Sequence, residues 1–416
     1  MGSLARSTYL ASSWLAVRVL EQTLWVVVLA RTLGPGGYGL FAGITALAAT
    51  LGTLTGLGFG VLMLQDASRQ IGMLPAAWKK ALVMSMASGV VLCILYVLVA
   101  PGMFAERVPR GVYAAIGISE LICFPIVVVS SYAFQAHERM GWGGAMHALI
   151  PAGNLVALGL FLALSPSPDL SGYLPFHAAM AVLTTAGSLL AVKWLLSPGA
   201  ARFNVSRRDI QEGAGFSAMR LADTAMNSLD KTLVLQLASS QAAGMYSAAY
   251  RLISVIILPL TSLSMSVLPR LFRTESGDER STSLLIRSLA LGVTAYGVFA
   301  GLATWAASGL LPVLLGRDFA PAASVVRWMA ISPLLQGLYI IGANVLVTQR
   351  MLTLRILAQS LAIVVLLVSA GILVPSFGLP GAVLMLLVTQ ASAALLVWLC
   401  YLRARTSNSR RLQSKP

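Results

Sequence analysis

The feature that most constrains this chain is a series of long apolar segments with very few charges between them. The 416-residue sequence is 57% hydrophobic and 10% charged, and its mean hydropathy is +0.82. Soluble domains usually carry about 25% charged residues, and a helix needs roughly 20 apolar residues to cross a bilayer core. Twelve segments of that length follow one another along the chain. They span about residues 8–33, 39–64, 80–104, 110–133, 143–164, 172–196, 212–238, 241–270, 284–310, 322–347, 354–374 and 379–402. The sequence therefore predicts an all-α polytopic membrane protein.

The basic residues are distributed unevenly over the loops between these segments. Of the 29 Lys and Arg residues, twenty fall in one set of loops or at the segment ends beside it, four in or beside the opposite set, and five lie deeper within the segments. Because cytoplasmic loops are enriched in Lys and Arg, this bias predicts that both termini are cytoplasmic. It also explains the net charge of +15 without a nucleic-acid partner. The basic tail at 403–416 is expected to set the topology and to contact anionic membrane lipids.

The twelve segments are expected to form two six-helix bundles. The longest cytoplasmic connection, residues 197–212, separates a bundle of residues 1–196 from one of residues 213–402. The two halves are weakly similar where each begins, and the similarity aligns Gly39 with Gly244. Parallel repeats of this kind are a transporter architecture in which the substrate binds between the halves.

Sequence motifs disfavour several other classes of protein. The chain has no phosphate-binding G-x-x-x-x-G-K-[ST] loop, so ATP hydrolysis by that route is not expected. The three cysteines and three histidines have no metal-ligand spacing, and we predict no metal and no cofactor. Gly52, Gly56 and Gly60 recur every four residues within an apolar segment, which favours a small-residue face for close helix packing over a dinucleotide loop.

Charged residues within the apolar segments are the most informative, because charge at bilayer depth is costly and such residues face water or a partner. They are Arg18, Arg220, Lys231, Arg251 and Arg327 with Glu21, Glu120, Asp223 and Asp230. Several lie on one face of the segment 212–238, over about three turns. One interpretation is local pairing at i, i+3, as in Arg18 with Glu21, which would only fix helix contacts. The length of the stripe favours a hydrated central cavity.

We predict two groups of residues in this cavity. Arginine forks bind phosphate and carboxylate, and aromatic rings offer flat surfaces to sugars. The predicted substrate-binding residues are Arg18, Trp25, Arg220, Asn227, Lys231, Tyr250 and Arg251. A carboxylate in a low dielectric can carry a proton or bind Na⁺. The candidates for such ion coupling are Glu21, Glu120, Asp223 and Asp230.

Two stretches of the sequence are distinctive. One is Leu-Ala-Arg-Thr-Leu-Gly-Pro-Gly-Gly-Tyr-Gly-Leu-Phe at 29–41. The other runs from Leu-Asp-Lys at 229–231 through Ala-Gly-Met-Tyr-Ser-Ala-Ala-Tyr-Arg at 243–251 to Leu-Pro-Arg at 268–270. Both stretches resemble the Wzx-type polysaccharide flippases of the multidrug/oligosaccharidyl-lipid/polysaccharide (MOP) exporter superfamily.

The resemblance implies a fold, a substrate and a location. The fold would be two six-helix bundles in a V shape. The activity would be movement of undecaprenyl-diphosphate-linked oligosaccharide across the bacterial inner membrane by alternating access, with other polysaccharide assembly proteins as partners and no catalytic residue. Two alternatives stay open. One is a cation-coupled drug exporter of the same superfamily, which the intramembrane arginines disfavour. The other is a membrane polymerase or ligase, which the short external loops disfavour.

Overall fold

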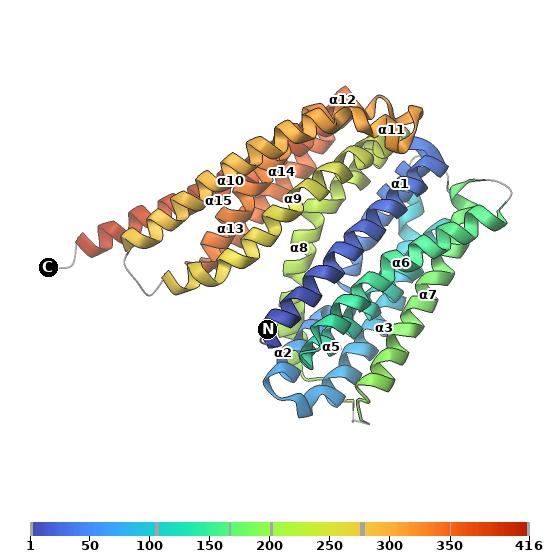
Figure 1. Ribbon diagram of the computed structural model, residues 1–416, viewed down its shortest axis with the longest axis horizontal. Helices are drawn as coiled ribbons and strands as arrows, with labels where there is room; N and C mark the ends of the chain where they lie inside the picture. Colours follow the sequence, from blue (N-terminus) through green and yellow to red (C-terminus); the bar gives the residue numbers. More distant parts are fainter. Residues whose placement is uncertain are drawn as a thin grey trace. The chain divides into compact units, whose positions relative to one another are not determined.

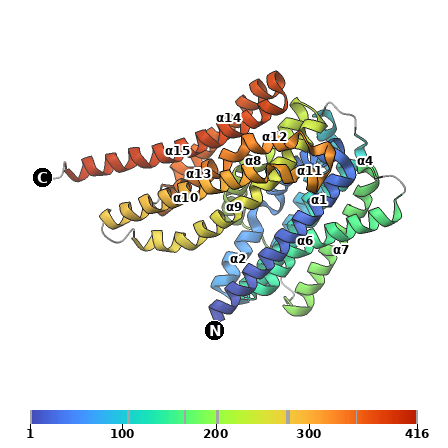
Figure 2. The same cartoon turned by 45° about the horizontal axis from the view of Figure 1, so that its top comes forward.

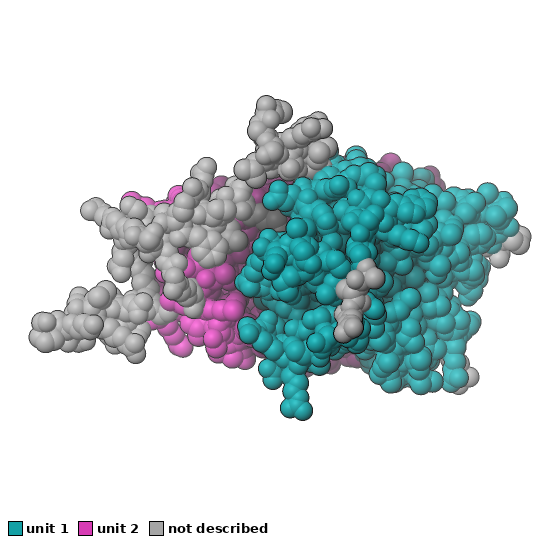
Figure 3. Space-filling model, turned by 90° about the horizontal axis from the view of Figure 1, so that it is seen from below, with its two compact units in different colours: residues 1–236 teal, residues 237–416 magenta. Residues whose placement is uncertain are grey.

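In the computed structural model, the residues described are almost entirely helical and include no strand (Figure 1). The structure describes the backbone of residues 3–104, 108–165, 168–199, 203–274, 279–349 and 351–413. It describes the side chains of residues 13–104, 108–165, 168–199, 203–262, 264, 283–349 and 351–403. The chain forms two compact units, residues 1–236 and 237–416, which Figure 3 colours teal and magenta.

The first unit is built from eight α-helices with short helical connections. These are α1 (Ser3–Gly52), η1 (Thr55–Gly58), α2 (Phe59–Arg69), η2 (Ile71–Met73), α3 (Leu74–Val99), η3 (Ala100–Gly102), α4 (Arg110–Gly117), the π-helical turn η4 (Ile118–Cys123), α5 (Phe124–Ala136), α6 (Met140–Leu164), α7 (Leu170–Leu195) and α8 (Arg207–Leu237). Within this unit α6 packs against both α1 and α7 (Figures 1 and 2).

The second unit contains the remaining helices. These are α9 (Ser240–Thr274), α10 (Glu279–Ala307), η5 (Ser308–Leu310), α11 (Leu311–Leu315), η6 (Arg317–Phe319), α12 (Ala322–Trp328), η7 (Met329–Ile331), α13 (Ser332–Thr348), α14 (Leu352–Phe377) and α15 (Leu379–Gln413). Apolar side chains of α9, α10, α13 and α15 form a buried cluster that includes Leu260, Val293, Leu346 and Val397.

The number of membrane spans agrees with the sequence prediction. Among the described residues, 10 helical segments are long and apolar enough to cross a membrane. That number takes the whole of α1 as one segment, although Gly34 interrupts the helix with φ 66° and ψ 178° directly before Pro35. It also leaves out α8, whose many charges set it apart. Dividing α1 at Gly34 and adding α8 gives the twelve expected spans. The chain is a multi-pass membrane protein, and the orientation of its termini stays a prediction.

Helix α8 packs with the first unit, whereas the sequence boundary at 197–212 assigned it to the second bundle. The Thr232 hydroxyl donates to the Gly43 carbonyl oxygen at 2.9 Å, and Leu235 fills the space beside Gly43 where a side chain would otherwise lie. At the other end of α8, Lys80 of α3 pairs with Asp209 at 2.8 Å. The division into two six-helix bundles therefore stays a prediction, with α8 held to the first unit by these contacts.

The second predicted span, 39–64, is interrupted where the sequence indicated one continuous helix. Helix α1 ends at Gly52 and α2 begins at Phe59. Between them Gly56, Leu57 and Gly58 adopt φ values of 74°, 44° and 73°. Glycine adopts these left-handed angles at little steric cost, so the glycines that were predicted to pack also allow the helix to break.

Neighbouring residues satisfy the backbone at this break, as the bilayer requires. The Gly56 N–H donates to the Ser88 hydroxyl at 2.7 Å, and the Thr55 hydroxyl donates to the Leu121 carbonyl oxygen at 3.0 Å. Close packing at the glycines is also confirmed, because a Cβ on Gly52 would lie 2.8 Å from the Glu120 carbonyl oxygen. The break is therefore a built feature of the first unit.

Candidate functional site

The first unit contains a pocket of about 190 Å³ beside the break between α1 and α2. Its lining comes from five parts of the fold: the end of α1, the break, the start of α2, the π-helical turn η4 with α5, and α8. The lining residues are Ala49, Gly52, Thr53, Thr55, Gly58, Gly60, Val61, Glu120, Phe124, Pro125, Val128, Val129, Tyr132, Ser217 and Arg220. Every one of them belongs to the first unit.

The pocket brings together two residues that the sequence placed in different groups. Arg220 was predicted to bind substrate and Glu120 to couple an ion, and both side chains line this pocket. Glu120 lies in η4, where the chain makes a π-helical turn. Turns of this kind occur often at functional sites. Because 100 residues separate the two in sequence, their meeting could not be read from local spacing.

The local ion pairs that the sequence allowed do not form. Within the part of the chain that the structure describes, Arg220 makes no ion pair with Asp223, and Arg18 makes none with Glu21. One oxygen of the half-buried Glu21 carboxylate also has no hydrogen-bond partner among the described residues. Arg18 and Arg220 are both exposed side chains. Their charges are therefore available to a ligand.

Arg18 and Arg220 share a neighbour on α6. The imidazole of His147 lies within electrostatic reach of both guanidinium groups. Helix α1 packs closely on α6 here, because a Cβ on Gly144 would lie 2.8 Å from the Trp14 Cβ. The fold thus gathers two arginines and a histidine from α1, α6 and α8 in one region of the first unit.

Trp25 lies in the core of the first unit, which differs from its predicted place on a cavity surface. Its indole is 9% exposed and donates to the Tyr173 hydroxyl at 2.9 Å. The ring also stacks on His177 at 6.5 Å and meets Phe41 edge-on at 5.7 Å. These contacts come from α7 and from distant parts of α1, so Trp25 packs the helices together and offers no flat surface to a sugar.

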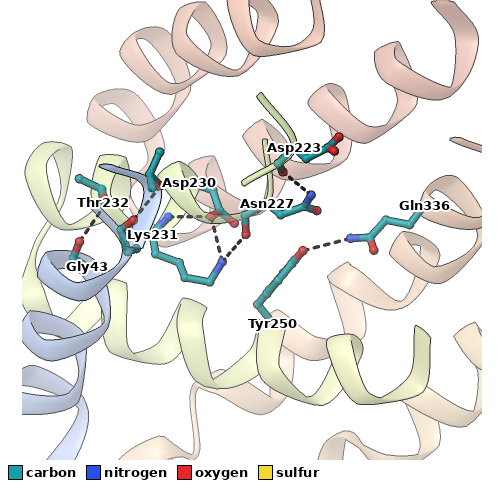
Figure 4. Close-up of polar contacts among 10 residues, drawn as sticks. Gly43, Asp223, Asn227, Asp230, Lys231, Thr232, Tyr250 and Gln336 are labelled. Atoms are coloured by element: carbon teal, nitrogen blue, oxygen red, sulfur yellow. Dashed lines mark hydrogen bonds and ion pairs between the residues drawn. The ribbon is translucent and has the colours of Figure 1, made fainter. Parts of the chain in front are cut away.

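The polar residues at the end of α8 hold one another, as Figure 4 shows. Asp230 is 1% exposed, and its carboxylate accepts from the Lys231 ammonium at 2.9 Å. The same ammonium donates to the Asn227 carbonyl oxygen at 2.9 Å, and the Asn227 side chain donates to the Asp223 carbonyl oxygen at 2.8 Å. Lys231 and Asp230 therefore form a buried charge pair in the first unit.

The two remaining candidates lie on α9 in the second unit. Tyr250 is half-buried, its ring stacks on Tyr246 at 6.4 Å, and its hydroxyl accepts from the Gln336 amide of α13 at 3.2 Å. Arg251 is also half-buried. Tyr250 and Arg251 thus lie on α9 of the second unit, where α13 contributes Gln336 as a polar neighbour. That these two residues share a cavity with the candidates of the first unit stays a prediction.

Sequence reasoning missed Ser217, which lines the pocket one turn before Arg220. Its side chain is 2% exposed, and its hydroxyl has no hydrogen-bond partner among the described residues. A single serine in a helical pattern carries no signal of its own. The i, i+3 spacing to Arg220 was the one available indication, because it places both side chains on the same face of α8.

Comparison with known proteins gives a family. The model of the polysaccharide biosynthesis protein family matches residues 3–275. No curated protein matches the chain.

Solved transporter structures share the fold. A mutant of the MATE transporter VcmN from Vibrio cholerae is 13% identical, with a TM-score of 0.64 over 97% of both chains. A MATE structure in a straight conformation is 15% identical, with a TM-score of 0.63 over 98% of this chain and 96% of the other. A MOP superfamily transporter from Pyrococcus furiosus is 17% identical, with a TM-score of 0.58 over 97% and 95%. The chain belongs to the polysaccharide biosynthesis protein family and has the fold of the MOP exporter superfamily.

Proposed function

We propose that this transporter is a flippase for polyprenyl-diphosphate-linked oligosaccharide, the repeat unit of a polysaccharide, in the bacterial inner membrane. The observation that carries the proposal is the pair of exposed arginines, Arg18 and Arg220, in spans of a chain whose family is polysaccharide biosynthesis. A guanidinium binds a phosphate oxygen pair in bidentate fashion and keeps its charge at bilayer depth. Arg251 on α9 supplies a third such group from the second unit.

Alternating access would then move the diphosphate and its glycan past these arginines while the lipid tail stays in the bilayer. Buried charge pairs such as Lys231 with Asp230 would hold α8 in shape, and the exposed Arg18 and Arg220 would contact the substrate. Export of drugs is the rival activity, because MATE transporters have the same fold. A drug exporter would be expected to bind cationic or apolar compounds, for which the arginines offer no attraction.

Transport in sealed vesicles tests the proposal directly. Purified protein would be reconstituted with a fluorescent polyprenyl-diphosphate-linked oligosaccharide, and the fraction accessible from outside would be followed with time. We expect protein-dependent movement of this lipid and none of a cationic dye. Movement of the dye alone would establish the rival activity.

Substitution of the arginines tests the site. Arg18→Ala, Arg220→Ala and Arg251→Ala are each expected to slow movement of the lipid about tenfold or more, because each removes a charged hydrogen-bond donor. Arg→Lys should restore part of the rate, since a point charge lacks the fork. Arg327→Ala is the matched control, because Arg327 is engaged by Ser308 at 3.0 Å and by the Trp305 ring. Equal rates in all four alanine variants would refute an arginine site.

Coupling to an ion gradient is a separate part of the proposal. Glu120 and Asp223 are the carboxylates that we expect to carry a proton or to bind Na⁺. Glu120→Gln and Asp223→Asn should slow transport and weaken its response to an imposed pH or Na⁺ gradient. Glu212→Gln is the matched control, because Glu212 is exposed and pairs with Arg208 at the start of α8. If transport by the native protein ignores both gradients, facilitation without coupling is the mechanism.

A further inference from the structure

We propose that the pocket of the first unit is an oxyanion subsite that takes one phosphate group. Its ligands would be the N-terminus of α2, the Ser217 hydroxyl and the Arg220 guanidinium. The site lies wholly inside the first unit, so it differs from a cavity between the two halves. Its chemistry does not depend on the identity of the transported glycan.

The N-terminus of α2 supplies the first element. Helix α2 has 11 residues, and its N-cap residue Gly58 carries no side chain that could accept from the first turn. The first N–H groups of an α-helix have no partner within the helix, and the helix dipole places partial positive charge there. The Phe59 N–H donates to the Gly56 carbonyl oxygen of the break, so the later N–H groups of the first turn are the ones that a ligand would bind. Gly58, Gly60 and Val61 line the pocket, so this end of α2 faces it. Helix N-termini of this kind bind phosphate.

Ser217 is the independent observation that points to a ligand. The residue is 2% exposed, lines the pocket and has no hydrogen-bond partner for its hydroxyl among the described residues. Buried polar groups nearly always have a partner, because an unsatisfied one is costly. A serine hydroxyl donates one hydrogen bond, which an oxyanion can accept. Because Ser217 also lines the pocket, a ligand bound there would give its hydroxyl a partner.

Arg220 gives the pocket its charge. It lies one helical turn after Ser217 and lines the same pocket. No described residue forms an ion pair with it. The arrangement attracts an anion.

The volume of the pocket suits a ligand of the size of one phosphate group. A volume of about 190 Å³ corresponds to roughly six waters at about 30 Å³ each. That space fits one tetrahedral oxyanion. Glu120 also lines the pocket, and as a carboxylate it would repel the anion. Because it would weaken the binding of an anion and strengthen that of a cation, Glu120 is the residue whose substitution best distinguishes the two kinds of site.

Equilibrium binding of radiolabelled inorganic phosphate to the purified full-length protein in detergent tests the site. Arg220→Gln should weaken binding about tenfold or more, because it removes a charge-assisted hydrogen bond. Ser217→Ala should weaken it roughly three- to tenfold, since it removes a single donor. Because Ser217 has no partner to lose, its replacement should leave the unfolding temperature unchanged.

Ser85→Ala is the matched control for Ser217→Ala. Ser85 is also fully buried with no hydrogen-bond partner for its hydroxyl among the described residues, but it does not line the pocket. The two alanine variants make the same chemical change, and only the one in the pocket should weaken phosphate binding. Equal effects of the two, or no effect of either Ser217→Ala or Arg220→Gln, would overturn the proposal.

Glu120→Gln separates an anion site from a cation site. If the pocket takes phosphate, removal of the carboxylate charge should strengthen phosphate binding severalfold. If the pocket takes Na⁺ through Glu120 and no phosphate, the same substitution should abolish Na⁺ binding measured with ²²Na and leave phosphate binding unchanged. That result would overturn the phosphate subsite and leave the ion-coupling role of Glu120 standing.

The phosphate group could belong to free phosphate, to a membrane lipid or to a lipid-linked substrate. Competition against labelled phosphate by phosphatidylglycerol and by sugar-free polyprenyl diphosphate, each in detergent, distinguishes these sources. A competitor that displaces the label at lower concentration than unlabelled phosphate identifies the source, and its affinity should fall in Ser217→Ala and Arg220→Gln. Failure of oligosaccharide transport with intact phosphate binding would sink the proposed function and leave this subsite standing.

Discussion

The helix that follows Gly39 in the first unit and the helix that follows Gly244 in the second begin alike and then differ. In the first unit the helix ends at Gly52, and three residues with positive φ precede α2. In the second unit α9 continues as one helix for 35 residues, from Ser240 to Thr274. The two helices are paired by the internal similarity of the sequence. Only the one in the first unit has a break with a pocket beside it.

The residue types at the paired positions explain the difference. The alignment of Gly39 with Gly244 places Gly56 opposite Thr261 and Leu57 opposite Ser262. In α9 the Thr261 hydroxyl donates to the Ile257 carbonyl oxygen at 3.1 Å, and the Ser262 hydroxyl donates to the Leu258 carbonyl oxygen at 3.1 Å. Both hydroxyls thus form hydrogen bonds with the backbone of their own helix. In the first unit the backbone at Gly56 binds Ser88 of another helix instead. A span breaks where glycine permits it and a neighbour supplies the partner.

Among the substitutions that test this difference, Gly58→Ala should cause the largest loss of unfolding free energy. The alanine would be held at φ 73°, and its Cβ would clash with the Gly213 carbonyl oxygen. Backbone strain of about 1–3 kcal/mol and a packing clash of about 1–3 kcal/mol together predict a loss of about 2–6 kcal/mol. The measurement is thermal unfolding of the purified protein in detergent, followed by tryptophan fluorescence.

Gly34→Ala is the control that separates strain from the clash. Gly34 has φ 66°, but a Cβ there would meet nothing within 4 Å. It should lose stability by strain alone, about 1–3 kcal/mol. If Gly58→Ala is no more harmful than Gly34→Ala, the close contact between α2 and α8 is not what holds the break.

Gly213→Ala tests the same contact from α8. A Cβ on Gly213 would clash with the Leu57 carbonyl oxygen, which belongs to the break. Overpacking against backbone predicts a loss of about 1–3 kcal/mol in unfolding free energy. Gly215→Ala is matched to it, because Gly215 lies two residues along the same helix with nothing within 4 Å of its Cβ position. That variant should gain about 0.5–1 kcal/mol from helix propensity. A loss at both positions would point to α8 in general.

Thr261→Gly tests the second unit. It introduces glycine opposite Gly56 without supplying a partner like Ser88, so α9 should stay continuous and lose less than about 1 kcal/mol from helix propensity. Hydrogen exchange at the amides of residues 258–266 checks the continuity. A marked rise in exchange there would show that glycine alone breaks the span, and the partner would then not be required.

The fold class could be predicted because length and hydropathy decide it. Backbone groups in lipid must be satisfied within helices, so each apolar segment of sufficient length becomes a span. The charges of α8 were also recognised from sequence, since charge in a span is rare. The break at 53–58 was not predicted, because glycines spaced by four indicate packing and breaking equally. The partner that decides between the two is Ser88, which lies on another helix.

The candidate site was predicted only in part, for a similar reason. Arg220 and Glu120 were recognised as charges, but their meeting in one pocket depends on η4 and α8 lying together. Trp25 occurs on the polar face of its helix in sequence, yet Tyr173 lies 148 residues away and takes the indole into the core. Ser217 gave no signal, because a serine is notable only once its missing partner is known.

The smallest expected effect concerns the ion pair that accompanies the glycine contact between α8 and the rest of the first unit. The Lys80 ammonium, at 2.8 Å, lowers the pKa of the Asp209 carboxyl, and Ser206 adds a backbone hydrogen bond at 3.2 Å. Because the pKa is lower in the folded protein, the stabilisation is complete above the unfolded pKa of about 3.9 and is lost as pH falls through the folded value.

Asp209→Asn should therefore lower the unfolding free energy by about 0.5–1 kcal/mol at pH 7 and match the native protein at the lowest pH that it tolerates. Glu212→Gln removes the exposed pair with Arg208 and should change nothing measurable. A deficit in Asp209→Asn that persists undiminished at pH 2.5 would mean that Asp209 acts through packing and not through its charge.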